Sequence, residues 1–251
     1  MKLPIISALH EGDGAAASSV AGDARAFTRL DACALFAVVG LLAVLTYPAL
    51  GGTRTRSDRV VCANHLRQIG KAFLEWGQEH NDSVPWERTI ADGGTYNHPL
   101  AMNAWLHFSW ISNELQSARV LACPSDRSSR PADDFTGSPA TGDLNPNFAN
   151  RATSYFLSHW SSVTPAVILA GDYNILRDGY ASCSRFRSVA FTTGTGLRNV
   201  GWTSDLHDQN GNLLFFDGRV EQTDNAGFFS LAKQMLSDSD NSNLHWLLPR
   251  Q

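Results

Sequence analysis

The stretch HDQNGNLLFFDG near the C-terminus contains the group of side chains best suited to chemistry. His207 lies close in sequence to Asp208 and Asp217, and a histidine beside carboxylates can transfer protons or hold a metal ion. However, the dipeptides Asn-Gly at 210–211 and Asp-Gly at 217–218 are typical of tight turns, because Asn and Asp tolerate positive φ. We therefore favour a turn, a strand and a second turn here. A hydrolase or metalloprotein that uses the three side chains is the rival hypothesis.

The same stretch contains the oxygen donors Asp208, Asn210 and Asn212 at alternate positions, like the start of a calcium-binding loop. An EF-hand would continue with Gly and end with Glu, but this chain has Leu213 and Arg219 at those positions. The EF-hand is therefore excluded. A looser calcium site built from the three donors stays as a candidate.

The four cysteines form no Cys-x-x-Cys pair, which argues against a zinc cluster; they are Cys33, Cys62, Cys123 and Cys183. Cys33 lies inside an apolar run. The other three allow one disulfide and one free thiol if the domain lies outside the cytoplasm, with Cys62 and Cys123 as the candidate pair. The alternative is that all of them are reduced and packed as small apolar side chains.

Other function classes lack their sequence signatures. No Gly-x-Ser-x-Gly, His-Glu-x-x-His or Walker loop is present, and the remaining histidines have no ligand spacing. The net charge of −4 provides no basic field for nucleic-acid phosphates. We expect no enzyme activity, no cofactor apart from the calcium candidate, and no nucleic-acid partner.

A long apolar run lies near the N-terminus, and residues 32–53 contain no charged side chain. At about 1.5 Å per residue, such a run is long enough to cross about 30 Å of hydrocarbon. Residues 1–25 mix Gly, Ala, Ser and a few charges without periodicity, and an acid, Asp31, lies at the edge of the apolar run. The sequence therefore predicts a leader followed by a transmembrane helix.

The helix is expected to continue beyond the apolar run to about residue 81. Apolar side chains recur there at spacings of three and four, which predicts one buried stripe; they are Cys62, Leu66, Ile69, Phe73 and Trp76. A second helix is predicted over 100–116, a long surface loop over 125–150, and a short helix over 228–236. Short strand-like runs separated by turn residues lie at 153–157, 166–170, 186–192, 213–216 and 219–222. Strands joined by turns favour an antiparallel sheet, so we predict an α+β domain at 54–251.

The start of the apolar run resembles the class III signal of prepilins and pseudopilins. That signal is a hydrophilic leader, a small residue that is usually Gly, and then Phe-Thr-Leu-Ile-Glu before an apolar helix. Here Ala26 is followed by Phe-Thr-Arg-Leu-Asp at 27–31, so Ala replaces Gly, Arg29 stands where Leu is common, and Asp31 replaces Glu. Two further segments, CANHLRQIG and VLACPSD, look like segments of bacterial pseudopilin-like proteins. His207 followed after nine residues by Asp217-Gly218 matches the H-X9-DG signature of prepilin-type processing-associated proteins.

The resemblance implies a pilin-like fold, with the long helix packed on the antiparallel sheet. It also implies cleavage by a prepilin peptidase/N-methyltransferase between Ala26 and Phe27, with methylation of the new amino group on Phe27. The leader would then be 1–26, and the transmembrane half of the helix 27–53. Asp31 becomes the recognition and assembly acid, which pairs with the N-terminal amine of a neighbouring subunit. The partners would be other pilins or pseudopilins. The location would be the bacterial inner membrane, crossed once, with the globular domain in the periplasm.

The arginines on the two sides of the apolar run bear on which side of the membrane the domain occupies. Arg54, Arg56 and Arg59 follow the apolar run more densely than Arg25 and Arg29 precede it, and the positive-inside rule alone would place the domain in the cytoplasm. We favour the pilin-like topology, because these arginines belong to the amphipathic helix of the folded domain.

The expected function is that of a pseudopilin or minor-pilin-like structural subunit of a type II secretion or type IV pilus-like system. The alternative is a membrane-anchored extracytoplasmic ligand-binding domain that uses a pilin-type anchor. Its ligand surface would be the loop at 125–150 or the aromatic group Trp105, Phe108 and Trp110, which otherwise belongs to the core.

Overall fold

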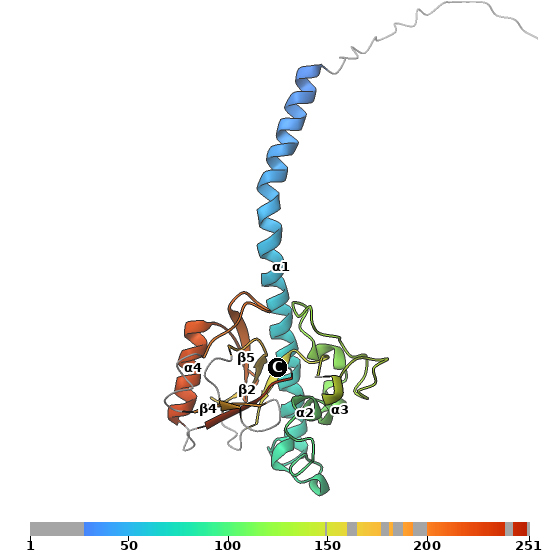
Figure 1. Ribbon diagram of the computed structural model, residues 1–251, viewed down its shortest axis with the longest axis vertical. Helices are drawn as coiled ribbons and strands as arrows, with labels where there is room; N and C mark the ends of the chain where they lie inside the picture. Colours follow the sequence, from blue (N-terminus) through green and yellow to red (C-terminus); the bar gives the residue numbers. More distant parts are fainter. Residues whose placement is uncertain are drawn as a thin grey trace, which may run out of the picture. The chain divides into compact units, whose positions relative to one another are not determined.

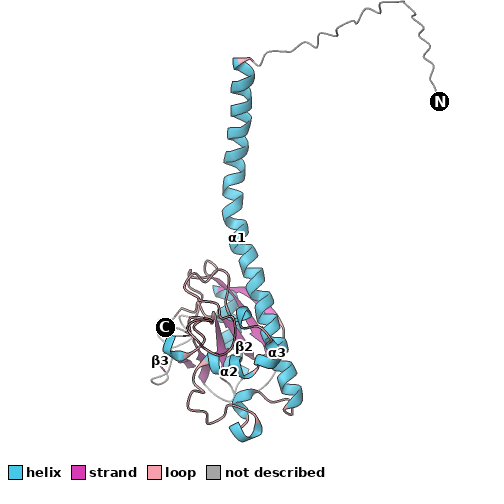
Figure 2. Cartoon of the chain, turned by 90° about the vertical axis from the view of Figure 1, so that its right-hand side faces the viewer, coloured by secondary structure: helices cyan, strands magenta, loops and turns pink. Residues whose placement is uncertain are grey.

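The computed structural model describes residues 28–148, 150–159, 165–176, 181–182, 188–192, 200–238 and 243–249. The chain divides into two units, Met1–Pro48 and Ala49–Gln251. The second unit is an α+β domain with an antiparallel sheet, as the strand pattern predicts. Figures 1 and 2 show the long helix α1 and the sheet of this domain.

The sheet has the strand order β3-β4-β7-β1-β2-β5-β6, and every strand pair is antiparallel. The strands are β1 Tyr155–Ser158, β2 Ile168–Asp172, β3 Ala181–Ser182, β4 Ser188–Thr192, β5 Asn210–Phe215, β6 Val220–Asp224 and β7 Asn243–Leu247. The helices are α1 Arg29–Glu79, α2 Ala104–Trp110, α3 Ser112–Leu115 and α4 Asn225–Asp238. Four short 3-10 helices are η1 Pro85–Glu87, η2 Ile90–Asp92, η3 Ala118–Leu121 and η4 Pro146–Phe148.

The central strands are apolar at successive positions because both faces of the sheet are covered. Along β5 and the residue after it, Leu214 and Phe216 join the core cluster that contains α1, whereas Leu213 and Phe215 join the cluster that contains α4. Side chains of a strand alternate between the two faces. The continuous run LLFF therefore supplies apolar side chains to two separate cores.

The second half of α1 packs on one face of the sheet. The predicted stripe is confirmed, since its members Cys62, Leu66, Ile69, Phe73 and Trp76 are all buried in one core cluster. The helix lies close to the sheet at Gly70, where an added Cβ would meet Leu214 Cδ1 at 2.7 Å. Glycine at this position therefore permits the close approach of α1 to β5.

The opposite face is covered by α4 and carries a column of stacked aromatic rings. Trp202 stacks on Phe228 at 4.2 Å between ring centroids, Phe228 on Trp246 at 5.6 Å, and Trp246 on Phe156 at 4.6 Å. All four rings are buried. This face is thus held by apolar packing of large rings.

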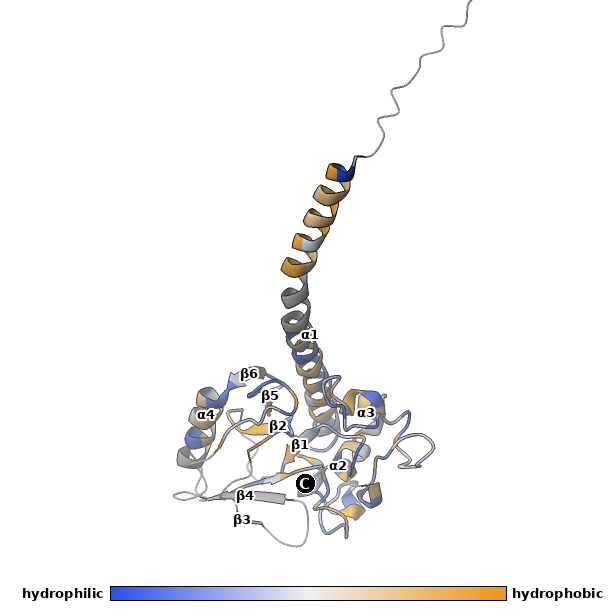
Figure 3. Ribbon diagram, turned by 45° about the horizontal axis from the view of Figure 1, so that its top comes forward, coloured by the Kyte–Doolittle hydropathy of each residue, from blue (hydrophilic) through white to orange (hydrophobic). Residues whose placement is uncertain are grey.

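The first unit contains the N-terminal part of α1. From Leu30 to Leu45 its apolar side chains are largely exposed, and Figure 3 colours these turns as hydrophobic. The helix begins with a capping box, in which the Asp31 carboxylate accepts hydrogen bonds from the Thr28 backbone N–H at 3.0 Å and from the Thr28 hydroxyl at 2.8 Å. Along the described part of the chain, no helix combines the length and apolar character that a membrane crossing requires. The predicted span 27–53 lies partly outside the described residues, because the side chains at 46–55 are not described.

The structure differs from the prediction at α2 and α3 and at β7. The single helix predicted over 100–116 is two short helices, α2 and α3, because the backbone leaves the helical region at Ile111 with φ −95° and ψ 25°. Strand β7 falls in a segment with no predicted element. It pairs with β1 and β4, strands from distant parts of the chain, so its strand character depends on contacts that local pattern does not contain.

Candidate functional site

A disulfide joins the second half of α1 to the segment that follows η3. It links Cys62 and Cys123, which are 61 positions apart in the sequence and have Cα atoms 5.3 Å apart. Both are buried. Of the remaining two, Cys33 is free and exposed, and Cys183 lies outside the described residues.

His207 lies against this disulfide. Its Nε2 atom is 3.4 Å from Cys123 Sγ and 3.5 Å from Oδ2 of Asp172, the last residue of β2. The imidazole comes from the loop that leads into β5, and both His207 and Asp172 are buried. The fold therefore brings a disulfide sulfur, an imidazole and a carboxyl group into one buried cluster.

Asp172 is held by the neighbouring strand. Its Oδ2 accepts hydrogen bonds from the backbone N–H of Asn212 at 2.7 Å and from the Asn212 side-chain amide at 2.8 Å. The same amide also reaches the Arg59 carbonyl on α1 at 3.4 Å, while the Arg59 guanidinium donates to the Thr223 carbonyl at 3.3 Å. The cluster is thus fixed by β2, β5, β6 and α1 together.

The electrostatics of the cluster follow from burial. Burial raises the pKa of the Asp172 carboxyl to about 7, although the Asn212 hydrogen bonds and the Arg59 charge act to lower it. Burial also lowers the pKa of the His207 imidazole to about 4, and the Arg59 charge adds to this effect. The imidazole is therefore uncharged near neutral pH, so its contact with Asp172 is not an ion pair.

The cluster does not have the geometry of a nucleophilic triad. In such a triad the imidazole uses one nitrogen for the nucleophile and the other for the carboxylate. Here Cys123 and Asp172 both face Nε2 of His207, and Nδ1 has no hydrogen-bond partner within the described part of the chain. Cys123 is also oxidised in the disulfide. The arrangement suits structural bonding or metal coordination better than acyl transfer.

The residues of the rival hydrolase hypothesis are not brought together. His207 precedes β5, and Asp217 lies in the turn after it, where it accepts a hydrogen bond from the Arg219 backbone N–H at 2.9 Å. Asp208 is exposed with φ 51°, and Gly218 occupies the turn with φ 83°. The nine-residue spacing between His207 and Asp217 is therefore the length of one strand and its flanking turns.

Two of the three calcium-candidate side chains donate hydrogen bonds through their amides. Asn210 donates to the Asp208 carbonyl oxygen at 2.8 Å, whereas the Asn212 amide faces Asp172. The geometry thus directs Asn212 to a carboxylate rather than to its sequence neighbours.

The candidate ligand surfaces and the predicted cleavage residues have different positions in the structure. Phe108 is fully buried, and Trp105 and Trp110 are half-buried against the same core cluster, so the aromatic group belongs to the core. The loop at 125–150 is held by buried Asp143, which pairs with Arg130 at 3.4 Å and with Arg151 at 3.0 Å. Ala26 and Phe27 lie outside the described residues.

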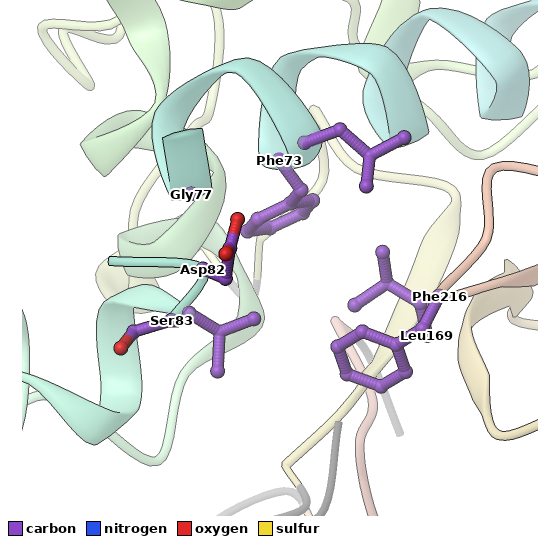
Figure 4. A pocket seen from close by; sticks show the side chains of 8 residues that line it. Phe73, Gly77, Asp82, Ser83, Leu169 and Phe216 are labelled. Carbon is purple, nitrogen blue, oxygen red and sulfur yellow. The ribbon is translucent and has the colours of Figure 1, made fainter. Parts of the chain in front are cut away.

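A small cavity lies between the C-terminal part of α1 and the sheet. Its volume is about 130 Å³, and Figure 4 shows apolar side chains around it with Asp82 and Ser83 at one side. It is lined by Phe73, Leu74, Gly77, Asp82, Ser83, Val84, Leu169 and Phe216. Ligand pockets for drug-sized molecules are commonly about 300–1,000 Å³, so this cavity fits a single ring or side chain.

Asp172 and Arg59 belong to the cluster around His207, although the sequence patterns did not predict either of them as a site residue. Asp172 follows Gly171, and this Gly-Asp pair is typical of a turn, yet both residues lie in β2. The contact with His207 depends on the pairing of β2 with β5, which no sequence signal specifies.

No family model matches this chain, and no match to it was found among curated proteins or solved structures.

Proposed function

We propose that this protein is a pilin-like structural subunit, a pseudopilin or minor pilin of a type II secretion or type IV pilus-like system. The observation that carries the proposal is the division of α1. Apart from Asp31, the side chains from Leu30 to Leu45 are apolar and largely exposed, whereas the stripe from Cys62 to Trp76 is buried against an antiparallel sheet. A helix of this kind suits an anchor at one end and a folded domain at the other.

The proposed location is the bacterial inner membrane, crossed once, with the globular domain in the periplasm. The absence of charged side chains over 32–53 supports the anchor. The buried Cys62–Cys123 disulfide supports an oxidising compartment for the domain, because disulfides persist mainly outside the cytoplasm.

The proposed processing follows from the residues before α1. A prepilin peptidase/N-methyltransferase would cleave between Ala26 and Phe27 and methylate the new amine, leaving Thr28 and Asp31 at the start of the mature helix. An acid at the edge of hydrocarbon is costly when unpaired. In an assembly, the Asp31 carboxylate would pair with the N-terminal amine of another pilin or pseudopilin subunit.

The capping box gives Asp31 a second role that an experiment has to separate from assembly. Asp31→Asn removes the charge, whereas Thr28→Val removes the hydroxyl contact of the cap and leaves the carboxylate in place. We expect Asp31→Asn to reduce cross-linked oligomers in membranes at least about tenfold, the effect of losing about 1.4 kcal/mol of pairing. Thr28→Val should assemble nearly as well as the natural chain. Equal loss in both variants would make Asp31 a helix cap and contradict the assembly role.

The cavity of about 130 Å³ favours a second candidate, an anchored ligand-binding domain. A cavity of about 150 Å³ can hold benzene, so the ligand would be a single small ring. Ligand-observed NMR with benzene tests this candidate. Binding that disappears in Leu74→Trp, which fills the rim of the cavity, would support it, and identical spectra for both proteins would exclude it.

A further inference from the structure

Two sulfur atoms and one imidazole nitrogen lie close together in the interior of the domain. The Sγ atoms of Cys62 and Cys123 and a ring nitrogen of His207 all lie within 4.8 Å of one another, and all three residues are buried. Thiolate and imidazole are the ligands that zinc prefers, and four-coordinate tetrahedral sites are its usual structural form. The donors come from α1, from the segment after η3 and from the loop before β5, so one ion would join three parts of the domain.

Asp172 lies beside this group but is not part of it, because the described donor atoms that all lie within 4.8 Å of one another belong to the two cysteines and His207. Asp172 Oδ2 is 3.5 Å from His207 Nε2, and Asp172 Oδ1 has no hydrogen-bond partner among the described residues. Its carboxylate would therefore place negative charge beside an ion, whose fourth position a water molecule can fill. With zinc bonds of about 2.0–2.3 Å, a tetrahedral site places nitrogen about 3.6 Å from sulfur. The observed separation of His207 Nε2 from Cys123 Sγ is 3.4 Å, so one edge of a zinc tetrahedron is already present in the disulfide form.

The sulfur–sulfur edge is set by the oxidation state of the cysteines. In the structure the two Sγ atoms are bonded to each other, whereas two thiolates on one zinc ion lie about 3.8 Å apart. The disulfide and the ion therefore exclude each other.

We propose that the reduced protein binds one zinc-class divalent ion through Cys62, Cys123 and His207, with the Asp172 carboxylate beside the ion, and that disulfide formation releases the ion. On oxidation each thiolate gives up one electron, the S–S bond forms, both metal–sulfur bonds break, and the ion leaves hydrated. The two electrons pass to a disulfide of a small thiol or of a thiol–disulfide oxidoreductase, which is cleaved to two thiolates. The ion would hold the domain together before oxidation, as the disulfide does afterwards. This inference does not depend on the proposed pilin-like function.

The test uses the full chain in detergent, reduced with a phosphine and titrated with Co²⁺ as a spectroscopic probe. The phosphine cleaves the disulfide with water to give two thiols and a phosphine oxide, and it leaves no competing thiol. We expect one Co²⁺ per chain, with thiolate-to-cobalt charge-transfer absorption, intense visible bands of a tetrahedral ion, and displacement by Zn²⁺. The oxidised protein should give none of these bands. Absence of binding, or Co²⁺ spectra without thiolate charge transfer, would overturn the proposal.

Two variants and a matched control assign the ligands. Asp172→Asn and His207→Ala should each weaken Co²⁺ binding by at least about tenfold, the lower range of effects for groups around a metal. His65→Ala is the control, because His65 lies on α1 close to Cys62 and contacts the Ala122 carbonyl at 3.1 Å. It should bind like the natural chain. Equal affinity in all three variants would remove His207 and Asp172 from the site.

Reduction itself can unfold the domain, and a second measurement covers that case. Near-ultraviolet circular dichroism of the packed tryptophans reports the native fold. If the reduced chain loses this signal, addition of Zn²⁺ should restore it, since binding energy then contributes to folding. A reduced chain that stays unfolded in Zn²⁺ would overturn the proposal.

Discussion

The two faces of the sheet are stabilised in different ways. The face toward α1 contains the Cys62–Cys123 disulfide and, at its edge, the polar cluster of His207 and Asp172. The face toward α4 contains the stacked rings of Trp202, Phe228, Trp246 and Phe156, and Trp202 Nε1 donates a buried hydrogen bond to the Thr223 hydroxyl, a group that does not titrate, at 3.1 Å. Redox state and pH should therefore affect the α1 face, while the α4 face should respond mainly to changes in packing.

The disulfide is expected to have the largest effect on the α1 face. It closes a loop of 61 positions, and the chain-entropy model gives a loss of about 4 kcal/mol in the free energy of unfolding when such a loop is opened. Urea unfolding of the full chain with and without a phosphine reductant, in a metal chelator, measures this loss. Cys33→Ser serves as the control and should show the same dependence on reductant. An unfolding midpoint that does not change on reduction would contradict the role assigned to the disulfide.

The α4 face should lose stability through packing alone. Phe228 is fully buried between Trp202 and Trp246, and Phe228→Ala should cost about 3 kcal/mol, the lower end of the range for such changes, because the neighbouring rings can close part of the space. The cost should be the same with and without reductant. Phe229→Ala is the matched control, since that ring is 38% exposed. A cost for Phe228→Ala that appears only after reduction would show that the two faces are coupled.

Acid should weaken the α1 side through His107. This buried imidazole contacts the Thr95 hydroxyl at 3.0 Å and the Ala101 carbonyl at 2.7 Å, and burial lowers its pKa to about 3, with His159 and His98 acting in the same direction. The folded protein therefore binds fewer protons than the unfolded chain between pH 3 and 6.5, so stability falls as pH drops through this window.

The loss that His107 contributes between pH 7 and pH 5 is about 2 kcal/mol, from an unfolded pKa of about 6.5. Asp172 and His207 also change stability over this window, in opposite directions, so the difference between the natural chain and a His107 variant isolates this contribution. Urea unfolding at several pH values measures it. His107→Gln removes the titration and can keep both hydrogen bonds, so its stability should change less over the same window. Parallel pH profiles for the two proteins would contradict this assignment.

Sequence patterns predicted the local elements better than the contacts between them. The stripe from Cys62 to Trp76 and the strands around Leu213–Phe216 were recognisable because periodicity is a local property. Strand β7 and the contact between His207 and Asp172 were not, since both depend on pairing between distant strands.

The H-X9-DG spacing illustrates this difference. In the sequence, His207 and Asp217 suggest a joint site, but β5 separates them. One end of the strand places His207 beside the disulfide, and the other end forms the turn at Gly218, whose backbone approaches Leu74 of α1. The donors of the polar cluster are likewise far apart in the sequence. A local motif such as Cys-x-x-Cys therefore cannot identify them.

The mass of the mature N-terminus tests the pilin-like function most directly. The full chain is extracted from membranes of cells with an active prepilin peptidase, and its N-terminal peptide is sequenced by mass spectrometry. We predict a chain that begins with N-methylated Phe27, two residues before α1 starts at Arg29. A chain that still carries residues 1–26 in these cells would contradict the proposed function.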